Sequence, residues 1–157
     1  LSAVAEAVSI PVLRKDFIGS EYQIVEARAH GADMVLLIMA GLDDGAVEER
    51  LELTHFWGME ALVETHSEEE IVRAVALNAR VIGVNARDLT TFELDPSLFG
   101  RVEHLIPDSV FKVAESAVMN SQDVTRYRNQ GAHAVLVGEA LVTGADPENT
   151  VREFVRA

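Results

Sequence analysis

The stretch Ile10-Pro11-Val12-Leu13-Arg14-Lys15-Asp16-Phe17 is an apolar run that ends directly in charged side chains. The run is continuous rather than alternating, which is typical of a strand with both faces covered, as in a parallel sheet. A dinucleotide-binding sheet would follow its first strand with a G-x-G-x-x-G loop, and no such loop follows this run. The stretch therefore favours a strand–helix barrel over an open doubly wound sheet.

Five further apolar runs follow at intervals of about 20 to 30 residues, the length of one strand–helix unit. They are Met34–Met39, Ala61–Val63, Val81–Val84, Val110–Ala114 and Ala134–Val137. The segments between them carry signals for helix starts and ends. The start signals are Ser20 with Gln23, Ser67 with Glu70, Asp95-Pro96 and Asp146-Pro147, and the end signals are Gly31, Gly58, Asn78 and Gly131.

These six units predict one domain over residues 1–157, because no linker or low-complexity tract divides the chain. We expect an α/β fold of the (β/α)₈ TIM-barrel class that lacks two of its strand–helix units. The chain begins at Leu1 rather than Met, within what resembles the end of a helix. We interpret that beginning as a sign of a missing upstream part.

Composition and charge restrict the partners and the location of the protein. The net charge of −13 predicts no binding to nucleic acid, and a phosphate site would need a local lysine or helix N-terminus. No apolar run approaches the roughly 18 residues of a membrane helix, so we expect no membrane association. The absence of cysteine excludes disulfides and thiolate metal sites and suits a cytoplasmic protein.

Polar side chains follow most of the expected strands at the point where each strand ends. In a barrel these ends meet at one face, which carries the active site. The second run is an exception, because it ends in apolar Met39-Ala40-Gly41. The polar groups are Lys15 with Asp16, Glu64, Asn85 with Arg87, Glu115 with Ser116, and Gly138 with Glu139.

Each of these residues taken alone allows a catalytic and a structural interpretation. Lys15 is either a general acid, its pKa lowered by burial, or a salt-bridged lysine. Glu64 is either a general base or a carboxylate bound to a loop. Asn85 either orients a substrate hydroxyl or forms a turn. Ser116 either holds a phosphate or caps the next helix.

The glycine at position 138 opens the last loop, where backbone amides approach phosphate in many barrels, although a plain tight turn explains it equally. Glu139 would repel a phosphate unless its carboxylate turns away. The five histidines, His30, His55, His66, His104 and His133, show no metal-ligand spacing and are interpreted as surface or helix-end residues. Trp57 is expected in the core.

Together, in this order, the strand-end segments resemble the indole-3-glycerol phosphate synthase family. Pro11–Phe17 resembles the motif of the family's third strand and Ala61–His66 that of the fifth. Ile82–Leu89 resembles the sixth-strand motif, Val113–Ser116 the seventh and Leu136–Ala140 the eighth. The resemblance covers essentially the whole chain and implies a barrel without its first two strand–helix units.

The family is a group of lyases of tryptophan biosynthesis. It converts 1-(2-carboxyphenylamino)-1-deoxyribulose 5-phosphate to indole-3-glycerol phosphate, with loss of carbon dioxide and water. The resemblance implies that Lys15 is the general acid and Glu64 the acid/base of the later steps, with Asn85 and Glu115 as hydrogen-bonding residues. It implies no metal and no organic cofactor. It also implies substrate walls at Phe17, Leu36, Arg87, Leu89 and Leu136, and a phosphate site at Ser116, Ala117, Gly138 and Glu139.

Two departures from the family pattern stand out. The family usually has glycine where this chain has Ala117, and a methyl group there would crowd the phosphate or disfavour a left-handed backbone. The first two strands carry a further glutamate, lysine and serine of the family's site. Two alternatives therefore stay open: a related phosphate-binding barrel such as phosphoribosylanthranilate isomerase, and a non-catalytic fragment that self-associates through open barrel edges.

Overall fold

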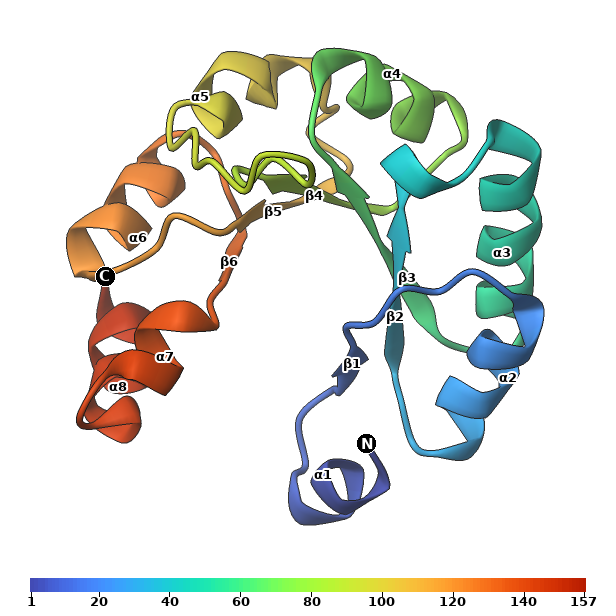
Figure 1. The fold of residues 1–157 in the computed structure, drawn as a ribbon, viewed down its shortest axis with the longest axis horizontal. Helices are drawn as coiled ribbons and strands as arrows, with labels where there is room; N and C mark the ends of the chain where they lie inside the picture. The colour runs from blue at the N-terminus through green and yellow to red at the C-terminus, as the bar shows by residue number, and fades with distance from the viewer.

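The computed structural model describes all residues from Leu1 to Ala157 and contains one sheet of six parallel strands. The strands pair in chain order and curl into an open arc, with β1 at one end and β6 at the other (Figure 1). This curled half-barrel confirms the six expected strand–helix units. The strands are β1 (Leu13–Arg14), β2 (Met34–Ile38), β3 (Glu60–Thr65), β4 (Val81–Asn85), β5 (Phe111–Glu115) and β6 (Ala134–Leu136).

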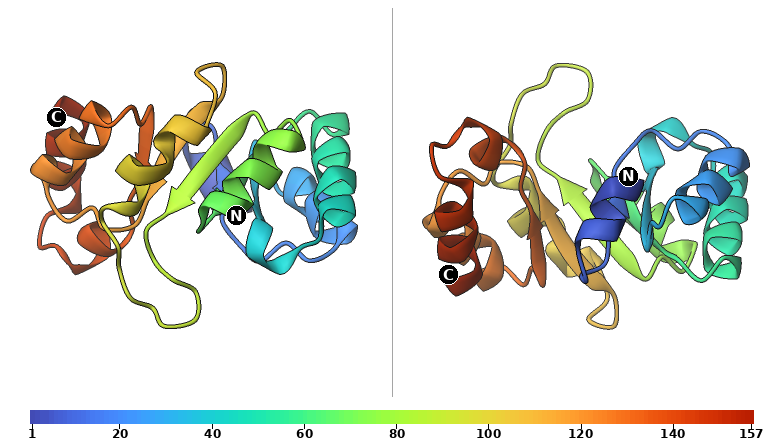
Figure 2. Two further views of the ribbon diagram at one scale, coloured as in Figure 1. Left: turned by 90° about the horizontal axis from the view of Figure 1, so that it is seen from above. Right: turned by 90° about the horizontal axis from the view of Figure 1, so that it is seen from below.

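Helices follow the strands and cover the convex side of the arc, as Figures 1 and 2 show. The principal helices are α2 (Glu21–Ala29), α3 (Asp44–Phe56), α4 (Glu68–Ala76), α5 (Leu98–Val102) and α6 (Ser121–Asn129). The short α1 (Ser2–Ala7) precedes β1, and α7 (Glu139–Thr143) and α8 (Pro147–Arg156) follow β6. Two 3₁₀ turns, Met39–Gly41 and Glu103–Leu105, complete the chain. None of the helices is both long and apolar enough for a membrane crossing.

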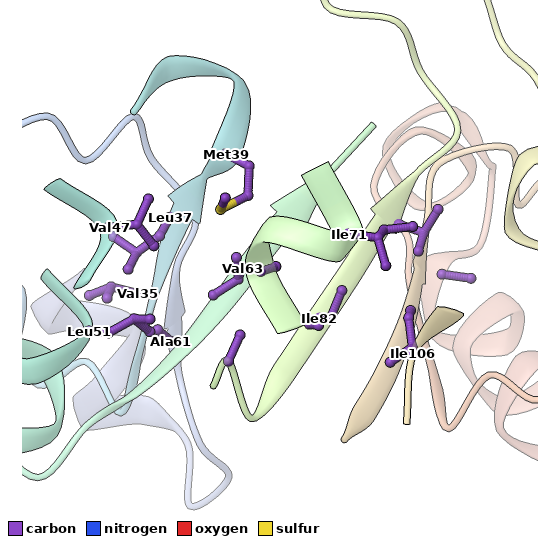
Figure 3. Packing of buried hydrophobic residues seen from close by; sticks show 14 of the residues in the cluster. Val35, Leu37, Met39, Val47, Leu51, Ala61, Val63, Ile71, Ile82 and Ile106 are labelled. Carbon is purple, nitrogen blue, oxygen red and sulfur yellow. The ribbon is translucent and has the colours of Figure 1, made fainter. Parts of the chain in front are cut away.

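Alternation along the strands divides the apolar side chains between two layers. The larger layer lies between sheet and helices, where Val35, Leu37, Ala61 and Val63 pack with residues of α3 (Figure 3). The smaller layer lies on the concave side and contains Leu36, Leu62 and Val113 as its buried members. The concave layer is small because β1 and β6 do not pair, so the inward side chains lack cover across the arc.

Most helix boundaries follow the local signals. Gly31, Gly58, Gly131 and Asn78 all have positive φ at helix ends. Asp146 accepts a hydrogen bond from the backbone N–H of Asn149, as expected of a residue that caps a helix beginning at Pro147. Ser20 and Ser67 precede α2 and α4 as expected. The start signal Asp95-Pro96 lies two residues early, because α5 begins at Leu98.

Two expectations were wrong. The first strand was expected over Ile10–Leu13, but only Leu13–Arg14 pairs, and Ile10 is 70% exposed. This strand has β2 as its only neighbour, so its first residues have no second partner to order them. Trp57 was expected in the core, but it lies at the C-terminal cap of α3 and is 41% exposed. The helix ends there, so Trp57 turns away from the inner face.

Candidate functional site

The carboxyl ends of the central strands bring three of the candidate residues to the concave face. Along β3, Leu62 points into the arc and Val63 outward, so Glu64 points inward. Asn85 ends β4 and pairs in register with Glu115, which ends β5. All three are buried, Glu64 to 2% exposure and Glu115 to 1%. Buried carboxylates at such positions require polar partners.

Lys15 follows β1 and supplies that partner. Its Nζ donates a hydrogen bond to Oε2 of Glu64 at 2.8 Å and lies 3.4 Å from Oε2 of Glu115. Burial lowers the pKa of Lys15, but the hydrogen bond to Glu64 and the charge of Glu115 raise it above its ordinary value overall. Of the two interpretations of Lys15, the salt-bridged lysine agrees with this geometry and the lowered pKa does not, because the two carboxylates outweigh desolvation. Lys15 is a charged donor at neutral pH.

The two glutamates beside Lys15 titrate in opposite directions. Burial raises the pKa of Glu64, but the imidazole of His66 at 3.2 Å and the hydrogen bond from Lys15 hold it well below its usual range. Burial and the negative charge of Glu64 raise the pKa of Glu115. One carboxylate therefore stays ionised while the other retains its proton near neutrality, which is the separation that acid–base chemistry needs.

Asn85 is held by its neighbours on both sides. Its Oδ1 accepts a hydrogen bond from Ser116 Oγ at 2.7 Å and another from the backbone N–H of Arg87 at 3.0 Å. Ser116 and Ala117 both have positive φ, +66° and +51°. The methyl group of Ala117 therefore does not block the left-handed backbone, although this conformation carries a strain of about 1–2 kcal/mol for a non-glycine residue.

Two pockets open on this face and share Lys15. A pocket of about 140 Å³ is lined by Lys15 with Phe17, Leu36, Glu64, Asn85 and Leu89. A larger pocket of about 440 Å³ brings Lys15 together with Glu115, Arg87, Leu136 and the four residues expected to bind phosphate, Ser116, Ala117, Gly138 and Glu139. The structure thus collects all of the candidate residues around one lysine, in two adjoining pockets that each combine apolar and polar groups.

Glu139 does not leave its carboxylate free to repel an anion. Its Oε2 accepts a hydrogen bond from Nη2 of Arg87 at 2.9 Å, and the pair spans the larger pocket. The side chains are partly exposed, so the ion pair itself is weak. The ion pair nevertheless orients the carboxylate of Glu139 toward Arg87, a residue of the loop after β4, which compensates its charge. No group of three or more histidine, cysteine, aspartate or glutamate side chains has an arrangement that could hold a metal ion.

The sequence analysis missed two residues of this site. His66 was interpreted as a surface or helix-end residue, yet its imidazole is 12% exposed and lies 3.2 Å from Glu64. The usable signal was its position two residues after Glu64 and four before Glu70. Gly83 lies inside β4, and a Cβ there would overlap the carboxylate of Glu115. A glycine inside a strand is a signal of such close approach.

Comparison with known proteins identifies the family. The family model described as indole-3-glycerol phosphate synthase matches residues 1–154. Synthases of that name from Mycolicibacterium smegmatis and Rhodococcus opacus are 57% and 54% identical over all 157 residues. Indole-3-glycerol phosphate synthase 1 of Streptomyces coelicolor is 54% identical over the same length. The chain spans 58% of the length of each of these relatives.

Solved structures support the same fold at low sequence identity. A crystal structure of 3-hexulose-6-phosphate synthase aligns with 98% of this chain and 76% of its own, with a TM-score of 0.80 and 18% identity. A native KDPGal structure aligns with 99% of this chain and 72% of its own, with a TM-score of 0.73 and 13% identity. The matching family model is that of the synthase rather than the isomerase considered as an alternative. With its strand-end motifs gathered around Lys15 and a match over nearly all its residues, the chain belongs to the indole-3-glycerol phosphate synthase family.

Proposed function

We propose that this chain is the larger part of an indole-3-glycerol phosphate synthase, a lyase that acts on 1-(2-carboxyphenylamino)-1-deoxyribulose 5-phosphate. The observation that carries the proposal is the ammonium group of Lys15, which lies between Glu64 and Glu115 where the pocket lined by Phe17, Leu36 and Leu89 meets the pocket lined by Ser116 and Gly138. The substrate has an aromatic ring at one end and a phosphate at the other, and in this proposal each end occupies one of the two pockets.

The roles of the residues follow from this arrangement. Lys15, protonated at neutral pH, donates its proton toward the substrate carbonyl as the ring attacks it. Ionised Glu64 accepts a proton in the later dehydration, while Asn85 and protonated Glu115 hold the substrate by hydrogen bonds. The ring closure needs the two reacting carbons held close together, and the enclosing walls supply that constraint. Those walls are Phe17, Leu36, Leu89 and Leu136, with Arg87 at the rim.

The phosphate site in this proposal is the larger pocket. Ser116 lines this pocket with its hydroxyl donated to Asn85, so it would have to turn from Asn85 to donate to a phosphate. Gly138 leaves open space around its backbone because no atom lies within 4 Å of where a Cβ would stand. Arg87 compensates the charge of Glu139. Lys15 supplies a charged donor at this site in a molecule whose net charge is −13.

We further propose that the complete fold is a (β/α)₈ barrel and that the six units seen here are units three to eight. The open arc, with unpaired edges on β1 and β6, supports this, as does the 58% span of the relatives. The chain is then one partial barrel domain, for which we infer a cytoplasmic location. Alone it would cover its open edges by self-association. Intact mass spectrometry of the natural gene product is the direct test of its length.

The activity is tested with a fused protein, in which the part of the M. smegmatis synthase that precedes its matched segment is joined to Leu1. The expected result is formation of indole-3-glycerol phosphate, measured by its absorbance, with no added metal or cofactor. The matched pair of variants is Glu64→Gln and Glu60→Gln, at the two ends of β3. Glu64→Gln should abolish turnover and Glu60→Gln should retain it. A folded fused protein without activity would refute the proposed function.

A further inference from the structure

His66 follows β3 directly, and its imidazole lies between two carboxylates. Nε2 is 3.2 Å from Oε1 of Glu64, and Nδ1 is 3.3 Å from Oε2 of Glu70. Burial lowers the pKa of His66, but its close contacts with the carboxylates of Glu64 and Glu70 together raise it to about 9. The imidazole therefore carries two protons near neutrality and can contact both carboxylates as a cation.

The two oxygens of Glu64 face different cations. Oε1 faces His66, and Oε2 accepts the hydrogen bond from Nζ of Lys15. The terminal torsion of a glutamate has broad preferences, so a carboxylate with one partner can rotate. Two partners on two oxygens define the plane of the carboxylate. The orientation of the oxygen that faces Lys15 thus depends on the contact that His66 makes with the other oxygen.

Glu70 ties this arrangement to helix α4. Ser67 caps that helix, and its Oγ accepts a hydrogen bond from the backbone N–H of Glu70. In a usual capping box the glutamate side chain would bond back to the cap residue, but Oε2 of Glu70 accepts from the backbone N–H of His66 at 2.7 Å. One oxygen of Glu70 therefore contacts both the backbone and the ring of His66. These contacts hold the ring against the first turn of α4.

Other charged groups face the imidazole from the loop after β4 and from α5. They line a pocket of about 360 Å³ together with His66, and they are Asp88, Glu93, Asp95 and Arg101. Asp95 is paired with Arg101 at 2.8 Å, and Asp88 accepts hydrogen bonds from the backbone N–H groups of Thr90 and Thr91. These partners leave Glu64 and Glu70 as the groups in contact with the imidazole.

We propose that His66 is a positioning residue that joins Glu64 to Glu70 and holds the Glu64 carboxylate with one oxygen directed at Lys15. This inference rests on the proposed function, because Glu64 is the group whose orientation matters for the reaction. His66 itself lines neither of the two pockets that contain Lys15, so it acts through Glu64 and not on the substrate. The helix α4, on the convex side of the arc, thereby sets the geometry of the site on the concave side.

A first experiment needs no turnover. NMR titration of the ¹³Cε1 signals in the fused protein, with His66→Gln to assign the resonance, should give His66 a pKa near 9. Glu64→Gln should lower that pKa by more than one pH unit. The matched control is Glu60→Gln, which removes the partner of His55 at the other end of β3 and should leave His66 unchanged. Titration of His66 near its ordinary value, or indifference to Glu64→Gln, would overturn the proposal.

A second experiment measures catalysis in the same fused protein. His66→Gln should lower kcat by about 10-fold to 100-fold, with KM within twofold, because the reacting groups are misaligned while the substrate pocket is intact. The acidic limb of its pH–rate profile should move to higher pH, since Glu64 loses a cation. His55→Gln is the control and should behave as wild type. Wild-type kcat and an unmoved profile in His66→Gln would contradict the positioning role.

If His66→Gln does not fold, Glu70→Gln decides the question, because it removes the anchor and leaves the imidazole in place. It should shift kcat and the pH profile in the same direction by a smaller amount, and a wild-type result would overturn the proposal. An inactive but folded wild-type fused protein would count against the proposed function alone. The NMR titration would still show whether His66 and Glu64 form the pair.

Discussion

Lys15 contacts two carboxylates with one ammonium group, so the three side chains act as a unit. Its side chain is 37% exposed, whereas Glu64 and Glu115 are almost fully buried. The exposed side of the ammonium group faces the two pockets that it shares. The carboxylates keep Lys15 protonated, and Lys15 in turn compensates their burial. Removal of the lysine would leave the ionised Glu64 carboxylate with His66 as its one cationic partner.

In the fused protein, Lys15→Ala should lower kcat by about 10²-fold to 10⁴-fold, the usual cost of losing a general acid. Substrate affinity should change little, because the pocket walls and the phosphate residues remain. Steady-state kinetics with calorimetric binding of substrate separates the two effects. Arg80→Ala removes an exposed cation at the opposite end of the strands and serves as the control. Turnover of Lys15→Ala within twofold of wild type would remove this lysine from the mechanism.

Gly83 shows how a missing side chain shapes the same unit. It lies opposite Glu64 in the strand register, and Glu115 occupies the space that its side chain would fill. Gly83→Ala should therefore displace the Glu115 carboxylate and destabilise the protein by about 1–3 kcal/mol, the range for overpacking. Urea unfolding checks the stability, and kcat in the fused protein should fall with it. Gly45→Ala in α3 meets only ordinary contacts and replaces a helical glycine, so it should leave kcat unchanged and should not lower the stability.

At the scale of the elements, loops and helix termini hold the site together. The loop after β5 places Ser116 and Ala117 in consecutive left-handed conformations, which turns the chain toward Asn85. The N-terminus of α4 holds His66 through Glu70. Both features are local. The loop after β5 adds backbone strain and the His66–Glu70 contact adds charge, and single substitutions can remove either.

Ala117→Gly should stabilise the chain by about 0.5–1 kcal/mol. Relief of left-handed strain contributes about 1–2 kcal/mol, and the greater freedom of glycine in the unfolded chain offsets part of it. Thermal unfolding at fixed protein concentration measures the difference. Ala117→Gly should also tighten binding of the phosphorylated substrate by the fused protein, because the methyl group lines the larger pocket. Calorimetric affinity equal to or weaker than that of wild type would contradict the second effect.

The raised pKa of His66 predicts a specific dependence of stability on pH. The folded chain binds the His66 proton more tightly than the unfolded chain, with the pKa raised from 6.5 to about 9. Its contribution is therefore complete below about pH 6.5 and lost as the pH rises through about 9. Partial solvent screening reduces the loss to about 1–2 kcal/mol. Denaturant unfolding measures the free energy of unfolding of wild type and His66→Gln across this pH range. The wild-type value should fall by this amount relative to that of His66→Gln, and parallel curves would contradict the prediction.

At the scale of the whole molecule, the open arc leaves two strand edges without partners. β1 pairs only with β2, and β6 pairs only with β5. Beside β6 lies an apolar pocket of about 630 Å³, with Val135, Val137, Leu141 and Phe154 among its walls. Unpaired edges next to apolar surface favour association with another chain. The net charge of −13 opposes association of identical chains, so salt should strengthen it.

We therefore predict that the 157-residue chain alone forms a dimer or larger assembly and has no synthase activity. Multi-angle light scattering at micromolar concentration tests the mass. Val155→Lys, at an exposed position of α8 beside the apolar pocket, should weaken the assembly. Val72→Lys, on exposed α4 in the middle of the arc, is the matched control. A monodisperse 17.1 kDa species with cooperative unfolding would show that six units close on their own.

The order of the strand–helix units, most of the helix boundaries and the strand-end positions of the candidate residues could be predicted from the sequence. These features are local, because continuous apolar runs, capping residues and glycines act within a few residues of themselves. The positions of Lys15, Glu64, Asn85 and Glu115 could be predicted for the same reason. Each directly follows or ends a run whose character is visible in the sequence.

The interactions of these residues with one another could not be predicted from the sequence, because they depend on how the strands come together. The direction of the Lys15 pKa depended on two carboxylates that lie 49 and 100 residues away in sequence. From the sequence His66 resembled a surface residue, but in the structure it lies between Glu64 and Glu70. Gly83 resembled an ordinary strand residue, but Glu115 occupies the space beside it. The electrostatic environment, the burial and the close contacts of a residue all depend on its neighbours in space. In this chain the curl of the sheet determines which distant strands become neighbours.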